Sequence, residues 1–182
     1  HRIQESESFP FSKYTSATYI TTSPSDHHLK IATSEGALWE TDIQAAITEG
    51  NLLHDAMAQI HTDADITAVF EAMDNSGNLT AEEIALLKFK IHSIIDHPQL
   101  KSLFKASARV ENEKEIITAS GMLLRPDRLN FNEDDSVTII DYKTGVPNYQ
   151  HEDQINSYAS AIEQMGKIVS EKILVYTNRE EI

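Results

Sequence analysis

The sequence predicts an α/β domain in which helices flank a central mixed β-sheet. Three observations support this prediction. Apolar residues recur at helical spacing between residues 34 and 61, and two strand-like apolar runs flank a polar cluster between residues 122 and 142. A second helical pattern, at residues 151–165, is followed by a last β-prone run. The chain has 182 residues, enough for one domain with a sizeable core.

Composition restricts the function classes. Twenty-nine acidic residues against 15 basic ones give a net charge of −14. Phosphate contacts require Lys and Arg, so this charge argues against a free-standing nucleic-acid binder that depends on electrostatic attraction. The chain contains no cysteine, which excludes disulfides, thiolate zinc sites and cysteine catalysis.

The sequence also bears on cellular location. No apolar run approaches the roughly 20 residues that span a bilayer, and the first residues contain no signal-peptide core, so we expect a cytoplasmic protein. Because the chain opens on His1 rather than on Met, we expect a fragment of a longer protein.

Residues 1–34 are rich in Ser and Thr, with β-prone pieces around residues 9–11, 18–22 and 29–32. We expect this segment to be a linker with one or two edge strands. Residues 35–182 are expected to form a single domain.

A helix is predicted from an N-cap at Ser34 to about His61. Its apolar positions follow the spacing of one buried face and comprise Trp39, Ile43, Ala46, Ile47, Leu53, Met57 and Ile60. Gly50 and His54 share that face. Glycine inside a helix costs about 1 kcal/mol relative to alanine, so we expect another part of the chain to approach closely at Gly50. Taken alone, a histidine on such a face is usually a core residue.

Three short helices are expected next, at residues 63–73, 80–95 and 98–105. The loop at residues 74–78 has the spacing of an EF-hand, but Ala72 stands where the first carboxylate ligand is needed. We therefore do not expect calcium binding. Thr80 and Glu83 instead predict a capping box at the start of the second helix.

The sheet is expected to begin at residues 106–118 and to continue in a β-hairpin. Its strands are predicted at Met122–Phe131 and Val137–Tyr142, on either side of a polar loop. If Phe131 pairs with Val137, the antiparallel register places Asp127 opposite Asp141 on one face of the sheet.

The alternation of side chains along a strand puts Asp141 and Lys143 on the same face and Tyr142 on the other. Facing carboxylates repel each other, so the pair of Asp127 and Asp141 calls for a counter-charge. A hard divalent cation held by both carboxylates is the natural one, with Lys143 beside it.

After a turn at residues 144–147, a helix is predicted from about His151 to Met165, with Gly166 as its C-cap. Gln154 and Tyr158 lie four residues apart and share one face of this helix. A final strand is expected at Lys172–Thr177.

The order of these residues resembles a known family. Pro126-Asp127 followed by Asp141-Tyr142-Lys143 resembles the PD-(D/E)xK nuclease motif. The longer set of RPDRL, IIDYKTG and Gln154-x-x-x-Tyr158 is similar to the RecB-like branch, and most similar to the nuclease domain at the C-terminus of UvrD/Rep-type helicases. RecB-like enzymes carry an upstream helical histidine, and His54 fits that place. The resemblance covers roughly residues 36–176.

This resemblance implies a restriction-endonuclease-like core and metal-dependent cleavage of DNA, within a helicase-nuclease that processes or repairs DNA ends. Asp127, Asp141 and Lys143 would be catalytic. The expected cation is Mg²⁺, for which Mn²⁺ can substitute. The remaining expected site residues are the metal ligand His54, the backbone carbonyl of Tyr142, the supporting or substrate-contacting Gln154 and Tyr158, and Glu115 as a weaker candidate near the metal.

Alternatives remain open at this point. A catalytically silent module of the same fold that binds DNA or braces a helicase is the main rival function. Gln154 and Tyr158 either line the cleft or are the flank of a helix packed on the sheet. Arg125 and Arg128 either touch the phosphate backbone or pair with nearby acidic residues.

Overall fold

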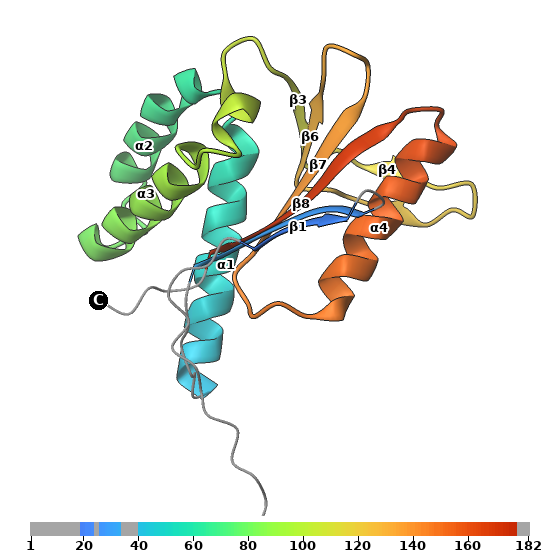
Figure 1. Ribbon diagram of the computed structural model, residues 1–182. Helices are drawn as coiled ribbons and strands as arrows, with labels where there is room; N and C mark the ends of the chain where they lie inside the picture. Colours follow the sequence, from blue (N-terminus) through green and yellow to red (C-terminus); the bar gives the residue numbers. More distant parts are fainter. Residues whose placement is uncertain (1–18, 24–25, 34–39, 178–182) are drawn as a thin grey trace, which may run out of the picture.

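The computed structural model describes residues 19–23, 26–33 and 40–177, with side chains from residue 48 onward (Figure 1). The strands are β1 (Tyr19–Ser23), β2 (Asp26–Thr33), β3 (Arg109–Asn112), β4 (Ile116–Ile117), β5 (Leu123–Leu124), β6 (Arg128–Phe131), β7 (Val137–Lys143) and β8 (Val169–Thr177). The helices are α1 (Glu40–Gln59), α2 (Ile66–Asn75), α3 (Ala81–Ile95) and α4 (Tyr149–Gln164), with 3₁₀ turns η1 (Asp63–Asp65) and η2 (Lys101–Phe104).

The predicted mixed sheet is confirmed. Its strand order is β1-β2-β8-β7-β6-β3, in which β8 runs parallel to both of its neighbours and the other pairs are antiparallel. β4 and β5 form a separate two-stranded sheet. In the segment where we expected edge strands, β1 is the outer strand and β2 pairs with β8. The expected piece at residues 9–11 lies outside the described residues.

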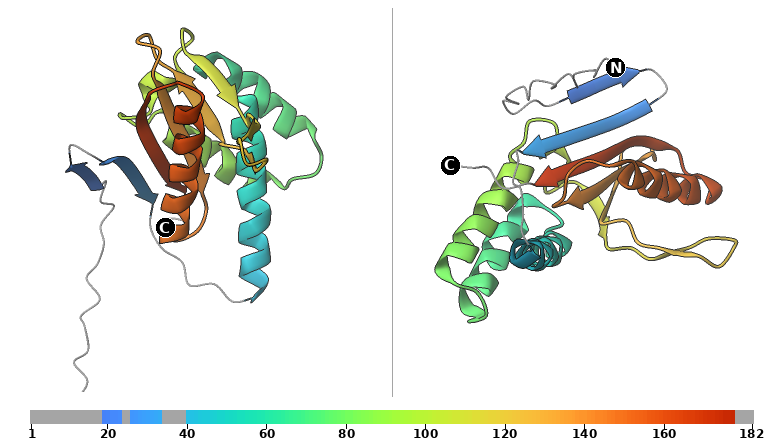
Figure 2. Two further views of the ribbon diagram at one scale, coloured as in Figure 1. Left: turned by 90° about the vertical axis from the view of Figure 1, so that its right-hand side faces the viewer. Right: turned by 90° about the horizontal axis from the view of Figure 1, so that it is seen from below.

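Helices cover both faces of the sheet (Figures 1 and 2). α1 and α3 pack on one face, where Ile140 and Tyr142 of β7 join their core. α4 packs on the other face, where Ile139 of β7 contacts its apolar side. The alternation along β7 therefore holds: the side chain of Tyr142 lies on the face opposite to that of Asp141.

The hairpin register is also confirmed. Phe131 pairs with Val137, and Arg128 pairs with Ile140. The first hairpin strand is shorter than predicted, because the chain between Met122 and Phe131 divides into β5 and β6. Pro126 lies at the break; proline has no N–H for a strand ladder and restricts the backbone of the residue before it.

Helix boundaries differ from prediction by a few residues. α1 begins at Glu40, and the expected N-cap Ser34 lies outside the described residues. Leu53 and Ile60 are wholly buried, as the periodicity predicts. The capping box of α3 is confirmed: the Glu83 carboxylate accepts from the Thr80 N–H at 2.7 Å, and the Glu83 N–H donates to Thr80 Oγ1 at 3.2 Å.

The C-terminal end of α1 is held by two polar side chains of the sheet. The Asn112 amide donates to the carbonyls of Met57, Ala58 and Ile60 at 3.0–3.2 Å. Arg128, which is 0% exposed, donates to the Ile60 and His61 carbonyls at 2.8 Å each. These bonds satisfy carbonyls that a helix end leaves without an internal partner. They also fix α1 against β3 and β6.

Arg128 is therefore neither a surface residue that could touch a phosphate backbone nor the partner of an acidic residue, the two roles expected from the sequence. It also donates to the Leu103 carbonyl at 2.7 Å and to Asn130 Oδ1 at 2.8 Å, and its guanidinium lies 4.0 Å from the centre of the Phe104 ring. It is a buried connector between α1, η2 and β6. Arg125 does pair with an acid, with its Nε 2.9 Å from Glu113 Oε2.

Candidate active site

Gly50 brings α1 close to the end of β7. A Cβ atom at Gly50 would lie 2.8 Å from Thr144 Oγ1, which confirms the close approach expected from a helical glycine at this position. Thr144 directly follows Lys143, and His54 lies one helical turn after Gly50. The glycine thus lets the helix that carries His54 pack against the strand that carries Asp141 and Lys143.

Gly50→Ala tests this close approach. We expect overpacking to destabilise the protein by about 1–3 kcal/mol, measured by urea unfolding. Thr144→Ala would remove the obstructing oxygen, so the double variant should recover most of the loss. Gly145→Ala is the control, since nothing lies within 4 Å of a Cβ atom there. Additive effects of the Gly50 and Thr144 substitutions would contradict the contact.

Asp127 is positioned by the backbone of the neighbouring strand. Its Oδ2 accepts the N–H of Tyr142 at 2.6 Å, and its Oδ1 lies 3.3 Å from His54 Nδ1. That contact with Asp127 is the main cause of a raised pKa at His54. The Tyr142 side chain itself is buried in the core, where its ring meets the edge of His54. A ligand role for the Tyr142 carbonyl remains a prediction.

Glu113 joins His54 and Asp127 in one cluster. One ligand atom from each of the three side chains lies within 4.8 Å of the others. Glu113 has a left-handed backbone (φ +49°), and its N–H donates to the Asp127 carbonyl at 3.0 Å. Burial, and then the charge of Asp127, raise the pKa of the Glu113 carboxyl.

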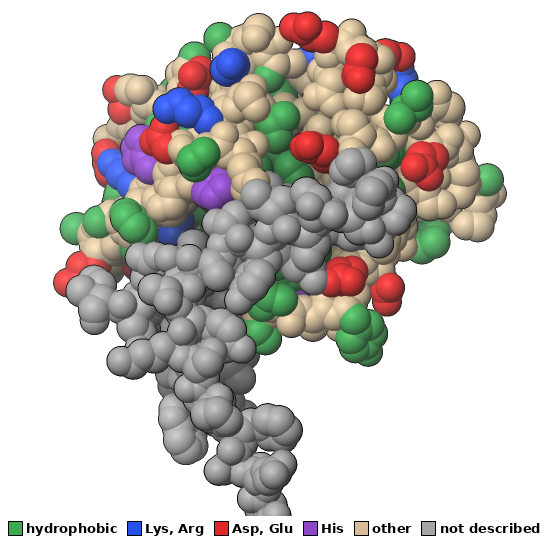
Figure 3. Space-filling view, in the orientation of Figure 1, with side chains coloured by type: hydrophobic (Ala, Val, Ile, Leu, Met, Phe, Trp, Pro, Cys, Tyr) green, Lys and Arg blue, Asp and Glu red, His purple; other side chains and the backbone are tan. Residues whose placement is uncertain are grey.

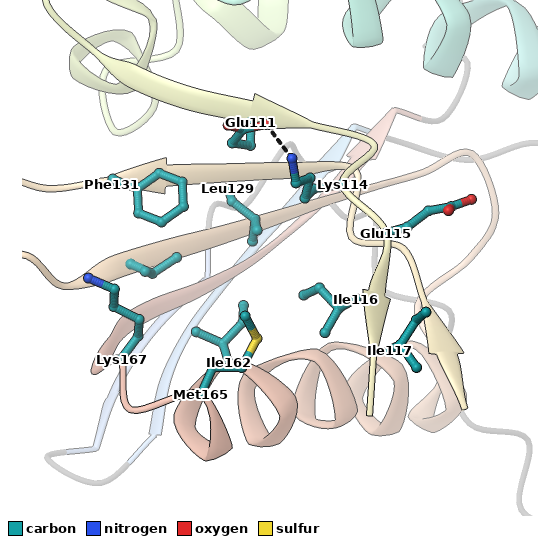
Figure 4. Close-up of a pocket in the computed structure, with 11 residues that line it drawn as sticks. Glu111, Lys114, Glu115, Ile116, Ile117, Leu129, Phe131, Ile162, Met165 and Lys167 are labelled. Atoms are coloured by element: carbon teal, nitrogen blue, oxygen red, sulfur yellow. Dashed lines mark hydrogen bonds and ion pairs between the residues drawn. The ribbon is translucent and has the colours of Figure 1, made fainter. Parts of the chain in front are cut away.

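The family resemblance implied Glu115 as a weaker candidate near the metal. Glu115 is exposed and lies beside a separate apolar cavity, with its carboxylate directed away from that cavity (Figure 4). Alternation along a straight strand treats Glu111, Glu113 and Glu115 alike. The left-handed turn at Glu113 ends β3 and separates these glutamates, and the residue pattern contained no signal for it.

Asp141 is buried without adequate hydrogen bonds. Its side chain is 1% exposed, and neither carboxylate oxygen receives a well-directed hydrogen bond, although Lys143 Nζ lies 2.6 Å from Oδ2. Burial, and secondly the charge of Asp127, raise the pKa of Asp141 to about 6. An ionised carboxylate in such a place is stabilised by an additional cation.

Lys143, the last residue of β7, is held in place by α4. Its ammonium donates to Gln154 Oε1 at 2.9 Å, and Gln154 Nε2 donates to the Tyr158 hydroxyl at 2.6 Å. Gln154 is exposed, whereas Tyr158 is buried in the core between α4 and the sheet. This chain of contacts orients Lys143 beside Asp141.

The donor set suits a divalent cation. Carboxylate oxygens are the ligands of Mg²⁺ and Mn²⁺ sites, and an imidazole nitrogen is a ligand for transition-metal ions. His54, Glu113 and Asp127 are close enough to share one ion, and the adjacent Asp141 carboxylate is buried beside the Lys143 ammonium without a well-directed hydrogen bond. In the visible face of the molecule, Lys and Arg side chains lie among acidic ones rather than in one basic patch (Figure 3).

None of the helices in the part of the chain that the structure describes is both long and apolar enough to cross a membrane.

A search of curated proteins found no match to the chain. The profile of the PD-(D/E)XK nuclease superfamily matches residues 21–178. This range includes every described site residue, and it includes the whole sheet apart from the first two residues of β1. The chain therefore belongs to the PD-(D/E)XK nuclease superfamily.

Proposed function

We propose that this chain is a metal-dependent deoxyribonuclease that hydrolyses phosphodiester bonds. The observation that carries the proposal is the cluster of His54, Glu113 and Asp127 next to the pair formed by buried Asp141 and half-buried Lys143. Membership of the nuclease superfamily supports the same activity. The resemblance of the motif set to RecB-like enzymes supports DNA as the substrate.

The site residues take distinct roles in this proposal. His54, Glu113, Asp127 and Asp141 would hold the cation, which supplies Lewis acidity and lowers the pKa of a bound water. Lys143 stabilises the negative charge that develops on the phosphate and orients the attacking water. Gln154 keeps the Lys143 ammonium in place, and Tyr158 orders Gln154.

Mg²⁺ is the proposed physiological cation, because the cluster is mostly carboxylate oxygen. The histidine makes Mn²⁺ a suitable substitute. We further propose that a helicase body is the partner, that the pair processes or repairs DNA ends, and that it works in the cytoplasm. The net charge of −14 supports a partner that delivers the DNA.

Cleavage of end-labelled single- and double-stranded DNA tests the proposal. The wild-type chain is expected to cut with Mg²⁺ or Mn²⁺ and not with EDTA. Lys143→Ala should lower the rate at least about 100-fold, because it removes charge stabilisation in the transition state. Lys172→Ala is the matched control, because Lys172 is a half-buried lysine on β8 whose ammonium contacts Asn156 rather than the site. No cutting and no Mn²⁺ binding by the wild type would instead favour a silent module.

Metal binding distinguishes the two candidate glutamates. Calorimetric titration with Mn²⁺ should show at least about tenfold weaker binding for Glu113→Gln, since a ligand is lost from the cluster. Glu115→Gln should bind Mn²⁺ like the wild type, because its carboxylate is exposed and outside the cluster. The opposite pattern would return the role to Glu115.

A further inference from the structure

The β4–β5 hairpin presents an apolar surface to solvent. Residues 116–124 read IITASGMLL and contain no charged residue, in a chain that is 24% charged. Ile117 pairs with Leu123 across the two strands, and their side chains are 74% and 56% exposed, with Met122 at 54%. The solvent face of a hairpin is normally polar. We call Ile117, Met122 and Leu123 the outer hairpin face.

The inner side of the same hairpin is already used. Ile116 and Leu124, the other cross-strand pair, belong to the core beneath α4. Ile116 points into a cavity of about 330 Å³ between the hairpin, α4 and the sheet, whereas Ile117 projects from the other side of the strand (Figure 4). The outer hairpin face is therefore not needed for folding of the hairpin against the domain.

Hydrogen bonds close the turn of the β4–β5 hairpin. The Thr118 N–H donates to the Met122 carbonyl and the Gly121 N–H donates to the Thr118 carbonyl, both at 2.9 Å. Thr118 Oγ1 accepts the Met122 N–H at 3.0 Å, and Gly121 has a φ of +82° that closes the turn. A surface ordered in advance loses little entropy when it binds a partner.

Both arms of the hairpin lead directly into the candidate metal cluster. Glu113 precedes β4 and Asp127 follows β5, each by three residues. Ile117 and Leu123 of the outer hairpin face lie four residues from Glu113 and Asp127, respectively, and four residues of extended chain span at most about 14 Å. A phosphate bound at the cluster would thus place the bases of its neighbouring nucleotides within reach of the outer hairpin face.

We infer that the outer hairpin face contacts the unstacked bases of the DNA strand whose phosphate lies at the metal cluster. This inference rests on the proposed nuclease function. Apolar side chains are inserted between bases or stacked on them by many DNA-binding proteins. The two cations at the foot of the hairpin are offset, because Lys114 pairs with Glu111 and Arg125 with Glu113. Contacts between the outer hairpin face and the bases would thus supply binding free energy that these paired cations do not supply through the phosphates.

The test combines protein variants with altered DNA. A fluorescent 20-nucleotide single strand is compared with the same strand lacking its bases, by anisotropy and by cleavage with Mn²⁺. Ile117→Ser/Leu123→Ser is expected to weaken binding of normal DNA about tenfold. Removing the bases should weaken wild-type binding by a similar factor and have no further effect on the double variant. Met122→Gln should show a smaller loss with the same pattern.

Phe89→Ser is the matched control, since Phe89 is 58% exposed on α3, away from the hairpin. Thermal unfolding checks that all variants fold. If the wild type cuts DNA and the hairpin variants bind both strands as it does, the inference is wrong while the nuclease proposal stands. The inference would also be overturned if the wild type formed a dimer that the hairpin variants could not form while their DNA binding was unchanged. The outer hairpin face would then be an interface between two copies of the chain. A wild type that neither binds nor cuts DNA would overturn both.

Discussion

Asp141→Asn is expected to abolish metal-dependent cleavage and, without metal, to make the protein more stable than the wild type at pH 7.5. The carboxylate is buried with no well-directed hydrogen bond, and its pKa is raised from 3.8 to about 6. A shift of this size corresponds to about 2–3 kcal/mol of destabilisation of the ionised form at pH 7.5. Asparagine has nearly the same shape and no charge, so it should recover most of that free energy.

The pH dependence has a defined sign. A carboxyl whose pKa is higher in the folded state binds its proton more readily there, so stability rises as pH falls from about 6 towards 3.8. His54 acts in the same direction, because its pKa in the folded state is raised, chiefly by Asp127. Its contribution to the stability of the fold is therefore fully present below pH 6.5 and is lost as pH rises through the pKa of the folded state. The metal-free wild type should be more stable at pH 5 than at pH 7.5.

Urea unfolding in EDTA between pH 5 and pH 8 measures both effects. Asp141→Asn should flatten the dependence of the unfolding free energy on pH, leaving the parts that belong to His54 and Glu113, whose pKa values are also raised. Asp153→Asn, which changes an exposed carboxylate on α4, is the control and should alter stability by less than about 0.5 kcal/mol. Adding Mn²⁺ should stabilise the wild type more than Asp141→Asn. An Asp141→Asn protein no more stable than the wild type in EDTA would contradict the desolvation of Asp141.

Arg128→Lys is expected to destabilise the protein by about 3 kcal/mol or more. Lysine cannot reproduce the planar set of donors that serves the Ile60, His61 and Leu103 carbonyls at once. Each buried carbonyl left without a donor costs about 1–3 kcal/mol. The end of α1 would lose its anchor, so Mn²⁺ binding should also weaken even though Arg128 does not touch the cluster.

A close control exists for this substitution. Arg109 also lies over a phenylalanine, with its guanidinium 4.6 Å from the Phe131 ring, but it is exposed on β3. Arg109→Lys should change stability by less than about 0.5 kcal/mol. Chemical denaturation of both variants beside the wild type provides the comparison. Equal losses for the two would show that stacking on the ring, rather than the carbonyl bonds, is what Arg128 contributes.

The β6–β7 hairpin shows which features of the fold the local sequence pattern could predict. Polar loop residues between two apolar runs predicted the pairing of Phe131 with Val137, and the period of two along a strand separated Tyr142 from Asp141. The close approach at Gly50 was predictable for a related reason, because a glycine is costly inside a helix unless space requires it. These features depend on neighbours in sequence or on one strand pair.

The sequence by itself determined the mixed sheet and the order of its main helices, and it pointed to His54, Asp127, Asp141 and Lys143 as candidate site residues. Only the tertiary structure decided that Glu113 rather than Glu115 joins His54 and Asp127, and that Arg128 is buried against backbone carbonyls. Periodicity reports which side of an element a residue occupies. The break at Glu113 and the carbonyls at the end of α1 come from distant segments that meet only in the folded chain, so no local pattern encodes them.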